Sequence, residues 1–207
     1  MKGQFFLISG CVVIVVLLLI KSSLNLSQII ENKRSLEISM ERKEFLNIKE
    51  QIYRAIDYSY NKNESENIEK YLKYVKNRLK GRTLELEGMV IEAFYNTTEP
   101  EGILNLVILN LLGEKILSLN LSFNDSEKYF SGLEDGSTLY TNFTFTISSN
   151  QNYNLCLNYS TLKQKKDYSI LIPVELNKSK LVAFFDLKFI GLRGEISEEF
   201  SRIVEIE

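Results

Sequence analysis

The chain contains no histidine among its 207 residues. Histidine is the commonest metal ligand and the usual base that activates a serine or cysteine nucleophile, so its absence excludes those arrangements. There are only two cysteines, Cys11 in an apolar run and Cys156 alone in the polar part of the chain. The polar part therefore has no internal disulfide and must fold on a hydrophobic core. We expect a protein that is not an enzyme and that needs neither a metal nor a cofactor.

The sequence also lacks phosphate-binding glycine motifs and Cys-x-x-Cys pairs. Carboxylates are therefore the remaining candidates for catalytic groups. Two carboxylates hydrolyse glycosides when they lie about 5–9 Å apart. The candidates are Glu85 and Glu87 on one strand face, and Glu195, Glu198 and Glu199 near the C-terminus. Oxygen-rich segments at 124–127 and 134–137 lack the spacing of an EF-hand calcium loop. We expect these carboxylates to be solvated, with no catalytic and no metal site.

One long apolar run begins near the N-terminus, and residues 5–20 carry no charge. As a helix this run is roughly 24 Å long, a little short of the ~30 Å hydrocarbon core, and flanking residues can extend it. We predict a single membrane span that contacts the lipid bilayer through residues 5–20. A signal peptide cleaved after Ser23 is an alternative, but Lys21 lies where cleavage needs a small residue. Lipidation of Cys11 is another, but the apolar core follows this cysteine instead of preceding it.

The first residues, Met1-Lys2-Gly3-Gln4 followed at once by the apolar run, resemble the class III signal peptide of archaeal type IV pilin-like proteins. The resemblance implies that a prepilin peptidase cuts between Gly3 and Gln4. It also implies that the apolar helix stays on the mature protein as its membrane anchor, and that other pilin-like subunits are partners. Ile8 stands at the fifth mature position, where many pilins have glutamate.

Glycosylation sequons, Asn-x-Ser/Thr, are unusually frequent. The chain has 18 Asn and 28 Ser or Thr residues, from which about two or three sequons are expected by chance. Sequons imply a surface that faces the outside of the cell, whereas the basic residues that flank the apolar run do not settle its orientation. We expect the soluble domain to be extracytoplasmic, with eight glycosylation candidates: Asn25, Asn63, Asn96, Asn120, Asn124, Asn142, Asn158 and Asn177.

Two helices are expected before the first strand. Residues 24–60 contain neither glycine nor proline, and apolar residues around Phe45 recur at helical spacing, which predicts an amphipathic helix that ends at a polar break, residues 61–64. A second helix is expected from a cap at Ser65 to a stop at Gly81. Its apolar face is Ile68, Leu72, Val75 and Leu79, and its polar face is Lys70, Lys73, Lys76, Asn77 and Lys80. We expect the basic face to be solvated, with no nucleic acid as a partner.

From Arg82 onward the hydrophobic period changes to two, which is typical of half-buried strands. Asn120, Asn142 and Asn158 fall on the polar phase, and Leu119, Phe143 and Leu157 on the apolar phase. We also expect a bulge at Gly88 and a hairpin turn at 112–115. The seven expected strands cover residues 83–95, 103–112, 116–123, 138–148, 153–160, 168–176 and 181–190. Strands without intervening helices predict an antiparallel sandwich.

The predicted fold is α+β: an N-terminal transmembrane helix and a helical neck, followed by an antiparallel β-sandwich. The expected segments are an anchor at 1–24, a neck at 25–81 and a sandwich at 82–207. We expect a single-pass cell-membrane protein of structural or adhesive type with its C-terminal domain outside, and a minor pilin-like subunit is one form of it. The alternative is an anchored binding module that faces the cytoplasm.

Overall fold

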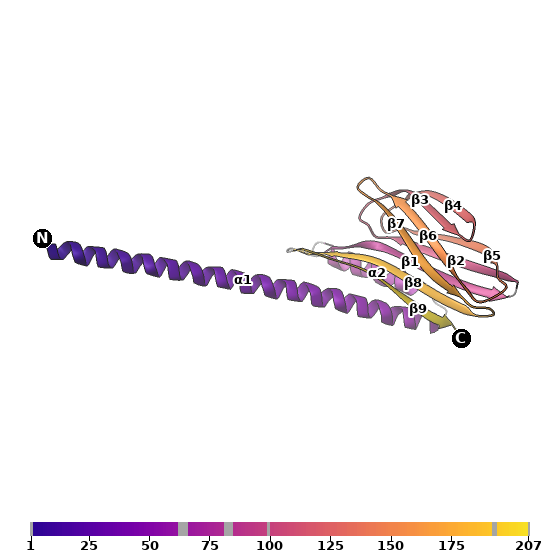
Figure 1. Ribbon diagram of the computed structural model, residues 1–207, viewed down its shortest axis with the longest axis horizontal. Helices are drawn as coiled ribbons and strands as arrows, with labels where there is room; N and C mark the ends of the chain where they lie inside the picture. The colour runs from indigo at the N-terminus through magenta and orange to yellow at the C-terminus, as the bar shows by residue number, and fades with distance from the viewer. Residues whose placement is uncertain (1, 62–65, 81–84, 99, 192–193, 207) are drawn as a thin grey trace. The chain divides into compact units, whose positions relative to one another are not determined.

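The computed structural model describes residues 2–61, 66–80, 85–98, 100–191 and 194–206. The chain is α+β, as predicted, with an apolar N-terminal helix and a sandwich of two antiparallel sheets. The elements are α1 (Lys2–Asn61), α2 (Glu66–Leu79), β1 (Glu85–Thr98), β2 (Glu101–Asn110), β3 (Ile116–Phe123), β4 (Ser126–Leu133), β5 (Thr138–Thr146), β6 (Gln151–Ser160), β7 (Lys165–Val174), β8 (Ser179–Ile190) and β9 (Glu195–Ile206) (Figure 1).

Contacts divide the chain into two compact units, residues 1–44 (unit 1) and 45–207 (unit 2). This division differs from the predicted boundaries after residues 24 and 81. The difference has a physical reason, because residues 45–56 and 68–79 pack on the sheet that follows them and share its core. The helical segment that was expected as a neck is therefore divided, and most of it belongs to the same unit as the strands.

Unit 1 is the first part of α1, which continues without a break from the apolar run into the amphipathic segment. Among the described residues, α1 is the one helix long and apolar enough to cross a membrane, and its most apolar window is not buried by protein. The side chains of residues 12–20 are 48–65% exposed. Water around such a continuous aliphatic surface is unfavourable, at about 25 cal/mol per Å², so this segment requires an apolar environment.

The nine strands of unit 2 form two antiparallel sheets. Sheet A has the order β5-β2-β1-β8-β9, and sheet B has the order β4-β3-β6-β7. β8 lies between β1 and β9, as expected from its apolar residues on both faces, and Pro173 lies on the edge strand β7. An edge position suits proline because it has no N–H to donate to a neighbouring strand.

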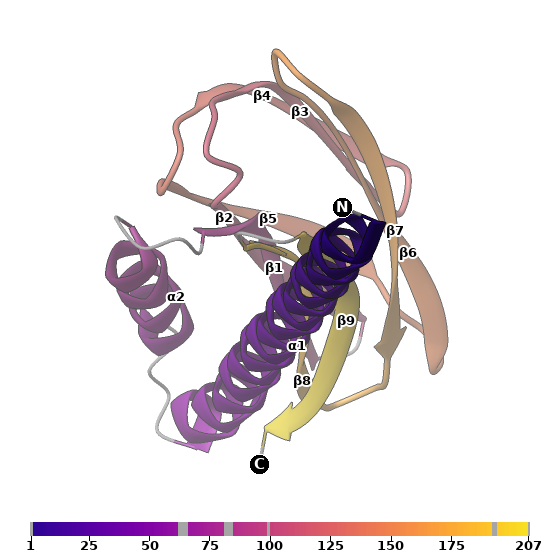
Figure 2. The ribbon, with the colours of Figure 1, turned by 90° about the vertical axis from the view of Figure 1, so that its left-hand side faces the viewer.

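Unit 2 has three layers, and sheet A is the middle one (Figure 2). One face of sheet A packs on sheet B through residues such as Ile91, Leu106 and Val182. The other face packs on residues 45–56 of α1 and on α2, where Ile52, Ile68 and other aliphatic side chains are fully buried. The alternation of strand residues between the two cores follows from the period-two geometry of a β-strand.

Several local predictions differ from the structure. The seven expected strands do not include residues 126–133 or 195–206, which form the edge strands β4 and β9. Residues 112–115 do not form a hairpin turn, because β2 and β3 lie in different sheets and this segment crosses between them. Pairing with β8 runs through Gly88 without a bulge, and a Cβ there would lie 2.3 Å from the Asp186 carbonyl oxygen. Glycine is required at this position by the close approach of the neighbouring strand. The expected helix cap at Ser65 and stop at Gly81 lie outside the described residues.

Candidate functional site

The expected cleavage residues, Gly3 and Gln4, lie at the start of α1. Only their backbone belongs to the described part of the chain. Cleavage between them therefore stays a prediction.

The sequons separate into exposed and half-buried sites. Asn96, Asn124, Asn142 and Asn177 are exposed, whereas the side chains of Asn25 and Asn63 are outside the described part. Asn120 and Asn158 lie directly opposite each other on β3 and β6, and both are half-buried. The strand phase is confirmed by Leu119, Phe143 and Leu157, which are at most 2% exposed. The polar-phase side chain is exposed at Asn142 but only half-exposed at Asn120 and Asn158, because β3 and β6 have neighbouring strands on both sides.

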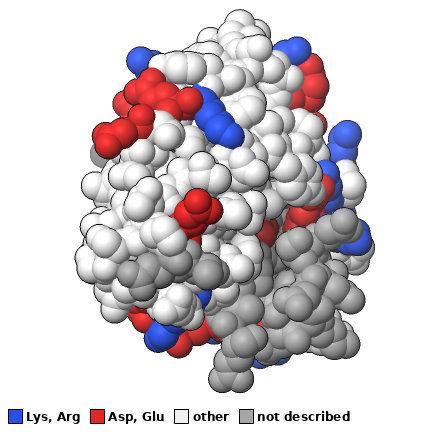
Figure 3. All heavy atoms as spheres, turned by 90° about the vertical axis from the view of Figure 1, so that its right-hand side faces the viewer, with Lys and Arg blue, Asp and Glu red and all other residues white. Residues whose placement is uncertain are grey.

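Three exposed sequons, at Asn96, Asn124 and Asn177, lie at the end of unit 2 that holds the C-terminus. Asn96 pairs with Ser179, which pairs with Ile206, and Asn177 lies in the β7–β8 connection between the two sheets. Asn124 occupies the β3–β4 turn next to Phe123, whose ring packs on Tyr153 near the β5–β6 connection. Most of the described surface at this end is free of charged side chains (Figure 3). Phe45, where the chain enters unit 2, packs instead on Phe189 near the other end of β8.

Of the carboxylates that the sequence offered for catalysis, the three near the C-terminus pair with lysines. Glu195 pairs with Lys188, Glu198 with Lys49 and Glu199 with Lys166. Glu85 and Glu87 lie near one end of β1 and line a pocket. Each member of the C-terminal cluster therefore compensates a separate cation.

The two oxygen-rich segments are turns. Asn124 and Asp125 have φ values of 44° and 61°, and they connect β3 to β4 by a two-residue turn. Two residues with positive φ give a turn whose twist matches that of the two strands of a hairpin, and Asn and Asp tolerate positive φ. In the other segment, Glu134 pairs with Lys115 and Asp135 with Lys76. Within the described residues, no group of three His, Cys, Asp or Glu side chains is placed to hold a metal ion.

A lysine bridges the two sheets at each open side of the sandwich. On one side, Lys128 of β4 donates to the carbonyl oxygen of Asn142 on β5. On the other, Lys166 of β7 lies 2.7 Å from carboxylate oxygens of Asp186 and Glu199. The Tyr168 phenol also donates to Asp186, and burial together with this carboxylate raises its pKa above the ordinary value. Charged edge residues of this kind discourage pairing with further strands.

A pocket of about 440 Å³ lies between α2, the start of β1 and the loops β2–β3 and β4–β5. Its walls combine three lysines, three carboxylates, one amide and two leucines. The lining residues are Lys73, Lys76, Asn77, Lys80, Glu85, Leu86, Glu87, Leu111, Gly113, Asp135 and Gly136. Ligand sites of small molecules begin at roughly 300 Å³, so the volume is sufficient for one small ligand.

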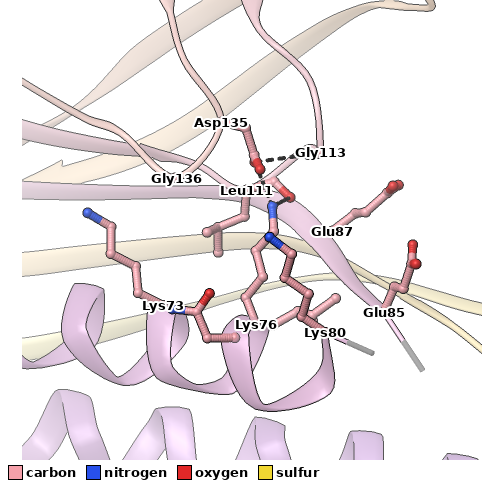
Figure 4. A pocket seen from close by; sticks show the side chains of 11 residues that line it. Lys73, Lys76, Lys80, Glu85, Glu87, Leu111, Gly113, Asp135 and Gly136 are labelled. Atoms are coloured by element: carbon pink, nitrogen blue, oxygen red, sulfur yellow. Dashed lines mark hydrogen bonds and ion pairs between the residues drawn. The ribbon is translucent and has the colours of Figure 1, made fainter. Parts of the chain in front are cut away.

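Lys76 is the central side chain of this pocket (Figure 4). Its Nζ donates to Asp135 Oδ1 at 2.5 Å and to the Leu111 carbonyl oxygen at 3.0 Å. Asp135 Oδ1 also accepts from the Gly113 N–H at 3.0 Å. Asn110, which is fully buried, fixes the loop by donating to the carbonyl oxygens of Glu114 and Leu133. The pocket therefore already holds one carboxylate, supplied by the protein itself.

Lys73 lies at the edge of the pocket and connects α2 to sheet A through Glu69. Glu69 Oε1 lies 2.6 Å from Lys73 Nζ, and Glu69 Oε2 accepts from the Tyr140 hydroxyl at 2.9 Å. Burial raises the pKa of the Glu69 carboxyl, but hydrogen bonds from Lys73 and Tyr140 and the charge of Lys73 outweigh that effect, so the pKa is lowered. The carboxylate form of Glu69 thus stabilises the contact of α2 with β5.

Sequence reasoning missed this pocket. It identified the basic face of α2, including Lys73, Lys76 and Lys80, but expected that face to be solvated. The partners come from four separate segments, and no periodic pattern connects Lys76 with Asp135, which is 59 residues away. No protein-family model matches the chain, and a search of curated proteins finds no match either.

Proposed function

We propose that this protein is a membrane-anchored cell-surface protein of structural or adhesive type. The observation that carries the proposal is the continuity of α1, which is apolar and unburied in its first part and belongs to the core of a β-sandwich in its last part. One helix thus serves as both anchor and structural element of the soluble unit. A protein of this build presents its β-sandwich at a membrane surface.

The exposed sequons support an extracytoplasmic orientation. Asn96, Asn124, Asn142 and Asn177 face solvent, so each has room for a glycan without loss of buried apolar area. Three of them gather at the end of unit 2 away from Phe45, where Glu175, Lys178, Lys180 and Glu205 compensate one another in ion pairs. A surface with these properties suits contact with neutral or glycosylated material outside the cell.

The N-terminal sequence supports a pilin-like form of this function, with processing between Gly3 and Gln4 by a prepilin peptidase. Membrane extraction followed by intact-mass measurement tests both parts of the proposal. The protein should leave the membrane fraction only with detergent, and its mass should correspond to a chain that begins at Gln4. Recovery in the soluble fraction, without detergent, would contradict the anchor. Retention of Met1 would contradict processing of the pilin type but not the membrane anchor.

A further inference from the structure

Lys76 of α2 and Lys80, which directly follows α2, meet one carboxylate in the pocket. Lys76 and Lys80 are one helical turn apart, and Figure 4 shows both side chains directed toward the region of Asp135. The Asp135 carboxylate pairs with Lys76 and accepts from Gly113. Among the contacts of the described residues, none engages the Lys80 ammonium group. Like charges four residues apart on a helix repel each other, so an additional anion between them would be favourable.

The rest of the pocket restricts what that anion belongs to. Leu86 and Leu111 line the pocket but are at most 1% exposed, whereas Asn77 supplies an amide that donates and accepts. Glu85 and Glu87 stand apart from the two lysine tips in Figure 4, and ionised carboxylates only accept hydrogen bonds. A ligand that fits therefore has one anionic group and several hydroxyl donors.

An acidic sugar unit has these properties. A pyranose ring has hydroxyl groups for Glu87 and Asn77, and a uronic acid adds one carboxylate for the lysines. A neutral sugar leaves the Lys80 charge uncompensated, and a small multivalent anion has no hydroxyl donors for Glu85 and Glu87. We propose that this pocket binds a uronic-acid unit of a saccharide, with its carboxylate between Lys76 and Lys80.

The site deepens the proposed function and rests on it for its biological role, because it gives a surface protein a saccharide ligand. Asp135 acts as an internal competitor, since its carboxylate already takes Lys76. Removing the charge of Asp135 should therefore strengthen binding, and removing that of Lys80 should weaken it. Opposite effects of the two substitutions are not expected from a general loss of structure.

Binding of glucuronate to the full chain in phosphatidylcholine nanodiscs, measured by titration calorimetry, tests the inference. Glucose tests whether the ring binds without the carboxylate, and sulfate tests whether an anion binds without the ring. The variants are Lys80→Gln, Asp135→Asn and the control Lys163→Gln, which removes an exposed charge that does not line the pocket. We expect saturable glucuronate binding, weaker binding of both other probes, and a loss of about tenfold or more in Lys80→Gln. Asp135→Asn should bind more tightly, and Lys163→Gln should be unchanged.

Three outcomes would overturn the inference: no glucuronate binding by the unchanged protein, sulfate binding as strong as glucuronate binding, or equal affinities in Lys80→Gln and Lys163→Gln. Circular dichroism of each variant shows whether it is folded. If Lys80→Gln does not fold, a Lys80→Arg variant, which keeps the charge, should bind as the unchanged protein does, and failure of that variant also counts against the site. These measurements use purified protein and do not depend on which side of the membrane the domain faces. Their failure is therefore distinguishable from failure of the proposed function.

Discussion

Replacement of Ile52 by alanine should destabilise unit 2 strongly, although Ile52 lies in α1 and not in the sandwich. Its side chain is 0% exposed and belongs to the core between the helices and sheet A. Three buried carbon atoms are lost, which is about 2.4 kcal/mol of transfer free energy at ~0.8 kcal/mol each, and the cavity adds to this. We expect a loss of about 3–4 kcal/mol in the free energy of unfolding.

The measurement is urea unfolding of a protein that lacks residues 1–24, followed by far-ultraviolet circular dichroism. This truncation leaves all of unit 2 and should give a soluble, folded protein, because residues 45–207 contain both cores. For a domain of this size the urea midpoint should fall by about 1–2 M in Ile52→Ala. Leu46→Ala is the matched control on the same helix, since Leu46 is 51% exposed, and it should change stability by less than about 0.5 kcal/mol.

The reasoning would be refuted if the two variants unfolded at the same urea concentration. Equal stabilities would mean that the last part of α1 does not pack on sheet A in solution. Aggregation of the truncated protein in the absence of detergent would refute the division into units as well.

Three further predictions concern other parts of the chain. Gly3→Val should block processing in cells that have a prepilin peptidase, seen as retention of Met1 by intact-mass measurement, and normal processing would contradict the pilin-like signal. In urea unfolding, Phe143→Ala should lower the free energy of unfolding by about 3–5 kcal/mol, and Asn142→Asp by under about 0.5 kcal/mol, because the two side chains lie on opposite faces of β5. A larger loss in Asn142→Asp than in Phe143→Ala would show that the register is wrong. Glu69→Gln should lower the free energy of unfolding at pH 7 and have little effect at low pH. The pKa of the Glu69 carboxyl is lowered in the folded protein, so the carboxylate contributes stability above its ordinary pKa of about 4.5, and this stability is lost as the pH falls through the pKa of the folded state. A constant difference across that range would count against the ionised Glu69 contact.

The sandwich could be predicted from the sequence because most of its strands bury one face and expose the other. β3, β5 and β6 show this alternation clearly, and their buried residues were assigned correctly. β4 was missed because it is an edge strand whose described side chains are all exposed or half-buried. β9 was missed because its inward positions include Glu198 and Arg202, whose partners are Lys49 and Asp57 on α1. These two charged positions interrupt an inward row that otherwise consists of Ile196, Phe200 and Val204.

The assignment of strands to sheets could not be read from local patterns. The segment after β2 has the composition of a hairpin turn, but Asn110 is buried and bonds to loop carbonyl groups, which directs the chain across to sheet B. The pocket depends on the same crossing, because Gly113 and Asp135 lie on two of the loops that connect the sheets, β2–β3 and β4–β5. Its residues become neighbours only through tertiary structure, so composition and spacing contain no signal for it.

The orientation of unit 2 is the most direct test of the account. A single cysteine at Ser149, an exposed position in the β5–β6 connection, provides the probe in a chain that also carries Cys11→Ala and Cys156→Ser. Intact cells are treated with a maleimide that does not cross membranes, and the labelled fraction is compared with that of lysed cells. The account predicts full labelling of Ser149→Cys in intact cells. Labelling only after lysis would contradict an extracytoplasmic domain and would favour the anchored module that faces the cytoplasm.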